Sequence, residues 1–184
     1  VTTPFMTKMM ATNLELYQAG EGVTAAGVFY SAGSKYSIIS GPFGAGWFSP
    51  TGSGITMGLI IAVMLFSKRD DFKAIAKLAI PCGIFNINEP IIFGIPMVMN
   101  AMFAVPFFLA PVACICCGYL VQSLGLCPLF VIDVPWTTPV GLFGFLASSG
   151  NIMGGIWQIV IIVGVSTLIY TPFVIAANRQ GAEA

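Results

Sequence analysis

The sequence predicts an all-α polytopic membrane protein in which transmembrane helices are combined with re-entrant helical hairpins. Hydrophobic residues make up 57% of the 184 residues and charged residues 8%, whereas a soluble domain has roughly 25% charged residues. Charge-free runs cover residues 36–67, 90–132 and 134–178, and each exceeds the ~20 apolar residues needed to cross a bilayer. Glycine and proline interrupt these runs, which is typical of broken helices around a site within the membrane.

The composition excludes several classes of function. The net charge is zero and the basic segment 68–77 is interleaved with Asp70 and Asp71, so nothing favours a nucleic-acid partner. The chain has five cysteines and no histidine, which excludes mixed Cys/His zinc sites. The cysteines of the CICC run, residues 114–117, have apolar neighbours, so we interpret them as small packing residues. We therefore expect no metal and no cofactor.

The first part of the chain is predicted to begin with an amphipathic helix over residues 4–19, which Gly20 ends. Residues 40–54 are too rich in glycine, proline and serine for a lipid-facing helix, and irregular backbone at membrane depth must be buried in protein or line a cavity. A membrane span is expected over residues 55–66, starting near Gly52 and ending at a charged loop, SKRDDFK.

Residues 74–104 are expected to form a re-entrant helical hairpin with its tip near NINEP, because glycine, proline and asparagine repeatedly break this segment. Residues 105–124 form the next predicted span and residues 153–178 the last, while the broken segment 124–150 is a second hairpin candidate. The positive-inside tendency places the 67–77 loop and the end of the last span in the cytoplasm.

Glu89 is the first candidate functional residue, because a charged side chain at the centre of a membrane helix costs about 2.5–3.5 kcal/mol and by default indicates a functional site. Asn86 and Asn88 flank it and add amide donors and acceptors, which suit a hydroxyl-rich ligand. The alternative is structural: the carboxylate would cap a half-helix or tie two helix ends together.

Trp136 and Asp133 are the candidates in the second broken segment. Trp136 lies in PWTTP, where its ring could stack on the apolar face of a sugar. Tryptophan is also a common anchor at the membrane interface, and the residues alone favour that interpretation. Asp133 is either a site residue or a cap of the hairpin.

Four blocks of sequence carry a resemblance to a known family. They are SPTGSGITMGLIIAVMLFSK, FNINEPIIFGIPMVMN, FAVPFFLAP and PWTTPVGLFGFLASSG, in this order along the chain. Together they resemble the C-terminal half of the lactose/cellobiose/diacetylchitobiose-type enzyme IIC permeases of the bacterial phosphoenolpyruvate-dependent sugar phosphotransferase system. The resemblance covers essentially all 184 residues.

The resemblance implies a multi-pass permease of the bacterial cell membrane that forms a homodimer through an N-terminal interface domain. Residues 1–184 would be the transport domain and thus half of the larger permease, without the interface domain. Glu89 would hydrogen-bond the sugar hydroxyl that is later phosphorylated, with Asn88 nearby and Trp136 stacked on the ring. Asn86 and Asp133 are added to this sugar-binding set on their position in the sequence.

The implied mechanism needs two further proteins. A phosphocysteine on a separate IIB component, itself supplied by IIA, would donate phosphate to a disaccharide of the cellobiose, lactose or diacetylchitobiose class. The permease would not be an enzyme on its own, and the catalytic share of Glu89 would be removal of a proton from the attacking hydroxyl. The family has a site histidine upstream of the matched half, and this chain has none, which we interpret as truncation.

Two other classes of function remain open from the sequence. An ion-coupled secondary transporter also has broken helices and one intramembrane acid, and Glu89 would then bind the coupling ion. A membrane-embedded enzyme would need a second polar catalytic group, and apart from Asp133 and the hydroxyl residues the chain offers none.

Overall fold

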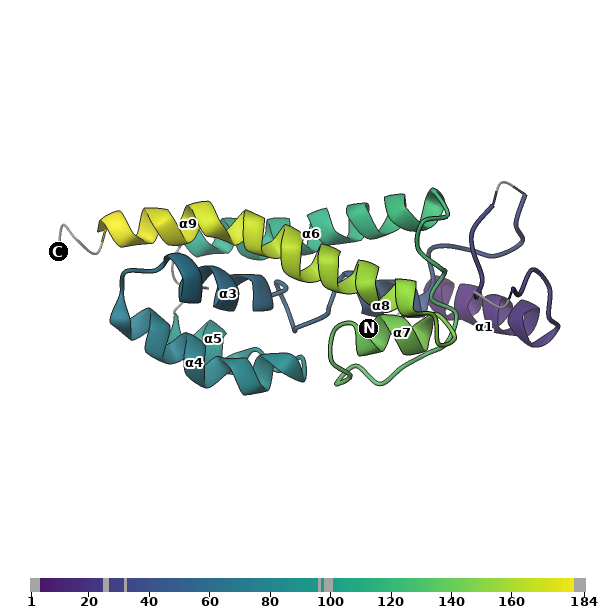
Figure 1. Ribbon diagram of the computed structural model, residues 1–184, viewed down its shortest axis with the longest axis horizontal. Helices are drawn as coiled ribbons and strands as arrows, with labels where there is room; N and C mark the ends of the chain where they lie inside the picture. The colour runs from purple at the N-terminus through teal and green to yellow at the C-terminus, as the bar shows by residue number, and fades with distance from the viewer. Residues whose placement is uncertain (1–3, 25–26, 32, 96, 98–100, 181–184) are drawn as a thin grey trace.

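The computed structural model describes residues 4–24, 27–31, 33–95, 97 and 101–180 as a bundle of helices and irregular segments. Over these residues there is no strand, only an isolated bridge between Thr24 and Gly27. Figure 1 shows the long helices running along the major axis of the molecule, with α1 at one end and the C-terminus at the other. The helices are α1 (Pro4–Gln18), α2 (Gly41–Trp47), α3 (Met57–Phe66), α4 (Asp70–Ile84), α5 (Glu89–Gly94), α6 (Ala101–Ser123), α7 (Leu142–Ala147), α8 (Ile152–Ile159), the π-helix η1 (Val160–Val165) and α9 (Ser166–Gln180).

Within the part of the chain that the structure describes, two helices are long and apolar enough to cross a membrane, and both coincide with predicted spans. They are Met102–Ser123 in α6 and Ile152–Arg179, which α8, η1 and α9 form without a break. Large apolar side chains, such as those of Phe108 and Leu168, are exposed on them. This surface suits contact with lipid. The membrane character predicted from composition is confirmed at this level.

The predicted span at 55–66 is shorter than expected. Helix α3 begins only at Met57 and has 10 residues, or about 15 Å, half the thickness of the hydrocarbon core. Thr51, Gly52, Gly54 and Ile55 all have positive φ, which a right-handed helix does not permit. The prediction of a clean span starting near Gly52 was therefore wrong.

The segment 70–94 folds as a helical hairpin with its tip where the sequence placed it. Helices α4 and α5 pack against each other and are joined at residues 85–88. The charged segment, predicted as a loop, is largely the first part of α4, which begins at Asp70. Beside it, the Arg69 guanidinium donates a 2.6 Å hydrogen bond to Asp71 and holds the pKa of that carboxyl below its usual range. Of the predicted second arm, residues 96 and 98–100 lie outside the described part of the chain.

The segment 124–150 forms one short helix, α7, and no pair of helical arms. Before α7 the backbone hydrogen-bonds to residues distant in the sequence: Leu129 N–H donates to Val28 O at 2.7 Å, and Val131 N–H to Ala147 O, at the end of α7, at 2.9 Å. Pro128, Pro135 and Pro139 lack the donors that a helix would need there. The predicted second helical hairpin is therefore not present within 124–150, where α7 instead packs on the following helix, α8.

The N-terminal part of the chain agrees with its prediction. Helix α1 ends at Gln18 and Gly20 has a φ of 73°. In the segment 40–54, α2 is mostly buried, and the Trp47 ring stacks on Phe130 with a centroid separation of 5.2 Å. The glycine-rich helix α2 is therefore packed inside the protein, as expected of a segment that is unsuited to face lipid.

Candidate functional site

Three segments that are distant in the sequence meet at the tip of the α4–α5 hairpin. They are the turn 51–53, the tip 86–88 and the loop 136–138. The side chain of Asn86 joins all three: its Oδ1 accepts from Thr51 N–H at 2.6 Å, and its Nδ2 donates to the carbonyls of Trp136 and, at 2.9 Å, Thr138. We call this meeting point the tip junction.

Asn88 makes a second link between the hairpin tip and the turn. Its Nδ2 donates to Ser53 O at 2.7 Å. A Cβ atom on Gly52, whose φ is 81°, would overlap the Asn88 amide. Both asparagines are 7% exposed. The structure thus brings Asn86 and Asn88 together as predicted, but turns their amide groups toward protein backbone.

Glu89 lies at the first position of α5, and its side chain is exposed. Among the residues that the structure describes, none hydrogen-bonds to or forms an ion pair with its carboxylate. A carboxylate in the first turn of a helix is favoured by the helix dipole. The structure is therefore compatible with the structural alternative for Glu89, yet leaves both carboxylate oxygens free to accept hydrogen bonds.

Trp136 is linked to the tip junction through its backbone. Its carbonyl accepts from Asn86, whereas its side chain is 66% exposed. Asp133 is also exposed, three residues before it. No described residue hydrogen-bonds to or forms an ion pair with the Asp133 carboxylate. An indole with a largely exposed ring can stack on a flat apolar face.

A largely apolar groove of about 300 Å³ adjoins the tip junction. Its lining comes from α3, the end of α4, residues 139–140 and the α8–η1 helix, and includes Thr51, Met57, Gly83, Ile84, Pro139 and Val163. Polar groups for hydroxyls and an apolar wall therefore lie next to each other, a combination typical of small-molecule sites.

Sequence reasoning missed two parts of this arrangement. The turn 51–53 was treated only as irregular backbone, and the one signal for it was glycine between two hydroxyl residues. Gln158 was not considered. It is 1% exposed, and its Oε1 accepts from Gly141 N–H at 2.8 Å and Gly144 N–H at 2.7 Å. It thereby fixes the start of α7 and the end of the loop that carries Trp136.

The cysteines of the CICC run do not converge. Cys114 is buried and its thiol contacts Ile161 O at 3.7 Å, whereas Cys116 is exposed on α6. In the described part of the chain no three His, Cys, Asp or Glu side chains are placed to hold a metal ion.

Comparison with known proteins decides the family. Residues 1–111 match the family model described as "Phosphotransferase system, EIIC". The chain belongs to the phosphotransferase system EIIC family. This EIIC chain is 42% identical over 133 residues to the cellobiose-specific EIIC component of Lactococcus lactis, covering 72% of the chain and 26% of that protein. It is 34% identical over 186 residues to the oligo-beta-mannoside-specific EIIC component of Bacillus subtilis, covering 97% of the chain and 38% of that protein.

The EIIC chain also resembles a solved structure. The transporter ChbC, the IIC component of the N,N'-diacetylchitobiose-specific phosphotransferase system, matches with a TM-score of 0.80 and 33% identity. The match covers 94% of this chain and 37% of ChbC. The chain thus spans 26% to 38% of the length of the curated relatives named above. The family resemblance predicted from the four sequence blocks is confirmed.

Proposed function

We propose that this chain is the sugar-binding transport domain of a phosphotransferase-system permease. It would bind a disaccharide of the cellobiose, lactose or diacetylchitobiose class in the bacterial cell membrane and present it for phosphorylation. Support comes from the EIIC match over residues 1–111 and from relatives described as specific for cellobiose, oligo-beta-mannoside and lactose. These relatives belong to one transport system, so an ion-coupled secondary transporter is not favoured.

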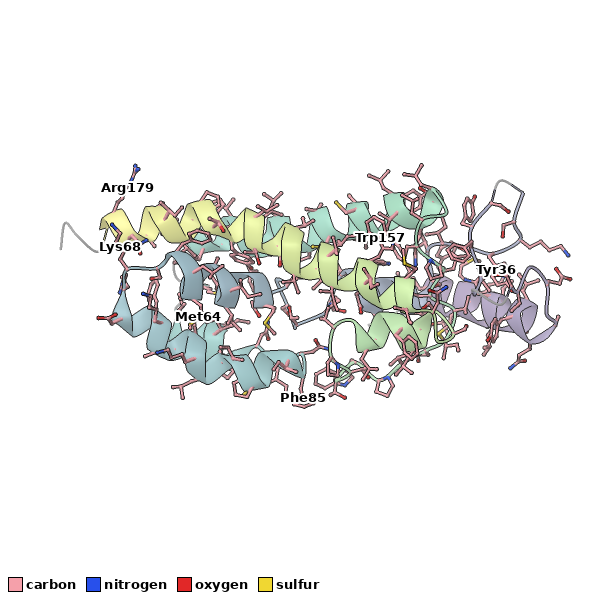
Figure 2. All side chains as sticks on the ribbon, viewed as in Figure 1. Tyr36, Met64, Lys68, Phe85, Trp157 and Arg179 are labelled. Carbon is pink, nitrogen blue, oxygen red and sulfur yellow. The ribbon has the colours of Figure 1, made fainter. Side chains whose placement is uncertain are left out.

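The observation that carries the proposal is that two exposed groups adjoin one junction. They are the carboxylate of Glu89, which follows the tip 86–88 and has no partner among the described residues, and the side chain of Trp136, whose carbonyl accepts from Asn86. Figure 2 shows Phe85, at the hairpin tip, well away from the end of the molecule that holds Lys68 and Arg179. If that charged end lies at the cytoplasmic surface, the tip lies within the membrane and the hairpin is re-entrant. A carboxylate at such depth without a protein partner is costly, and a ligand hydroxyl would offset part of this cost.

The site residues divide by what each can offer a sugar. Glu89 would accept a hydrogen bond from the hydroxyl that receives phosphate, and Trp136 would stack on the ring. Asp133 would accept from a hydroxyl at the edge of the site. Asn88 donates one Nδ2 hydrogen to Ser53 O, so its second Nδ2 hydrogen and its Oδ1 would be the groups that contact a sugar.

In the proposed reaction, phosphate would pass from a phosphocysteine on the IIB component to the sugar hydroxyl. IIA would recharge IIB, and the permease would act as a homodimer. Glu89 would take the hydroxyl proton as the oxygen attacks phosphorus, while the remaining residues would hold the sugar in line. No residue of this chain would carry the phosphoryl group.

The test replaces Glu89 with glutamine, which keeps the size of the side chain and removes its charge. Hydrogen bonds to charged groups contribute about 1.5–3 kcal/mol, so we expect Glu89→Gln to weaken cellobiose or diacetylchitobiose binding at least tenfold in calorimetry. Sugar-phosphate formation, measured in membranes supplied with phosphoenolpyruvate and the soluble components, is expected to fall further, because the base is also lost.

The matched control is Glu15→Gln, which removes an exposed carboxylate on α1 away from the tip junction and should leave both measurements unchanged. Parental binding and turnover in Glu89→Gln would show that the carboxylate is only a helix-end group. A lower melting temperature with normal turnover would lead to the same conclusion.

A further inference from the structure

Asn86 ends helix α4 in a way that does not by itself require asparagine. Its φ is 65°, its N–H donates to Gly83 O at 3.1 Å, and Ile87 N–H donates to Cys82 O at 3.0 Å. These two bonds around a left-handed residue form a Schellman motif. Glycine is the usual residue at this position because it adopts positive φ without steric cost.

What asparagine adds is its side chain, and all of its amide hydrogens are used. Both Nδ2 hydrogens are donated to carbonyls of the loop 136–138, and Oδ1 accepts from Thr51 N–H. The side chain is 7% exposed, so it has no free donor to offer a ligand. The left-handed backbone directs this saturated amide away from α4 and into two other segments.

The bonds reach across large separations in sequence. Thr51 lies 35 residues before Asn86, and the two carbonyls lie 50 and 52 residues after it. Asn88 reinforces the first link through Ser53 O at 2.7 Å. No described residue hydrogen-bonds to the Trp136 ring, so the bond that links Trp136 to the hairpin tip is the one accepted by its carbonyl.

We propose that Asn86 is a positioning residue of the sugar site: it fixes the loop carrying Trp136 against the hairpin tip carrying Glu89, and does not itself bind sugar. This proposal revises the expectation that Asn86 is a sugar ligand. The predicted effect of Asn86 on sugar affinity rests on the proposed function, whereas its role in holding the loop does not. The Trp136 ring and the Glu89 carboxylate would then stay at a fixed distance from each other. Two groups that bind the same sugar ring need such a fixed distance.

The first experiment needs no sugar and uses the full protein in detergent. Asn86→Gly keeps the Schellman backbone and removes the three side-chain hydrogen bonds. The fluorescence of Trp136 is isolated as the difference between each protein and the same protein carrying Trp136→Phe. We expect its steady-state anisotropy to fall and its quenching by acrylamide to rise in Asn86→Gly, because the loop is released.

Asn178→Ala is the matched control. Asn178 also binds a loop, accepting from Lys68 N–H at 2.8 Å and donating to Phe66 O at 2.9 Å, but at the charged end of the bundle. It should lower the melting temperature without changing the Trp136 signal. If Asn86→Gly does not fold, Asn86→Asp is used, since aspartate tolerates the left-handed backbone and keeps the acceptor for Thr51 while removing both donors to the loop.

The second experiment is a double-mutant cycle on sugar affinity. Asn86→Gly should weaken binding about tenfold, an effect within the range for loss of an aromatic stacking platform, because Trp136 would no longer be held in place. It should have no further effect in a Trp136→Ala background. Equal losses in the two backgrounds would make Asn86 a direct ligand and overturn the proposal. An unchanged Trp136 signal in Asn86→Gly would also overturn it. A parent that binds no disaccharide would refute the proposed function, while the fluorescence would still decide whether Asn86 holds the loop.

Discussion

Replacing the buried Gln158 with methionine is expected to destabilise the protein more than replacing an exposed glutamine with methionine would. The two side chains are similar in length, so the core stays filled and only hydrogen bonds are lost. Gln158 accepts from Gly141 N–H and Gly144 N–H at 2.8 and 2.7 Å and donates to Gly46 O at 3.0 Å. It therefore joins α8 both to the start of α7 and to α2.

The magnitude follows from the partners. Gly141 and Gly144 lie at the N-terminal end of α7, where backbone N–H groups have no acceptor within the helix. Three bonds at about 0.6–1.5 kcal/mol each give a loss of about 1.8–4.5 kcal/mol. Gln122 provides the comparison: it is also fully buried and donates a 2.9 Å hydrogen bond to Pro128 O. Gln122→Met should cost about 1 kcal/mol.

The assay is thermal unfolding of the purified variants in one detergent, followed by the loss of the monodisperse peak in size-exclusion chromatography. Gln158→Met should show the larger fall in melting temperature, and Gln158→Glu should also be destabilised, because its second carboxylate oxygen faces the Gly46 carbonyl. Equal stability of Gln158→Met and the parent would refute the reasoning, since it would mean that these backbone groups find other partners at no cost.

Two further predictions concern stacking and packing. Trp136→Ala should weaken sugar binding by about 1–3 kcal/mol, the scale for loss of an aromatic platform, and Trp136→Phe by less; unchanged affinity in calorimetry with lower thermal stability would make Trp136 an interfacial anchor. Gly58→Ala should cost about 1–3 kcal/mol of stability by overpacking, because a Cβ there would overlap Ser166 at the α3–α9 contact. Gly164→Ala, whose Cβ would have no atom within 4 Å, is its control, and equal melting temperatures for these two variants would contradict the close approach of α3 and α9.

The long helices and the hairpin tip were determined by the sequence itself. Helices α6 and α8–α9 coincide with predicted spans because an uninterrupted apolar run of this length has few alternatives in a bilayer. The tip at residues 85–88 was predictable because asparagine stops a helix locally and proline favours the first turn of the next. Glu89 and Trp136 stood out as candidates because a charge or a tryptophan in such a segment is conspicuous by chemistry alone.

What the sequence did not determine were the start of α3, the irregular path before α7 and the tip junction. Four left-handed residues between Thr51 and Ile55 delay α3, and their conformation depends on Thr56 Oγ1–H donating to Thr51 O and on Asn86 accepting from Thr51 N–H. The junction depends on side-chain hydrogen bonds to backbone groups 35 to 52 residues away. Hydrophobic periodicity reports which face of a segment is buried, but contains no information on which distant carbonyl an amide will meet. Only the tertiary structure therefore decided that Asn86, expected beside the sugar, is bonded to the loop that carries Trp136.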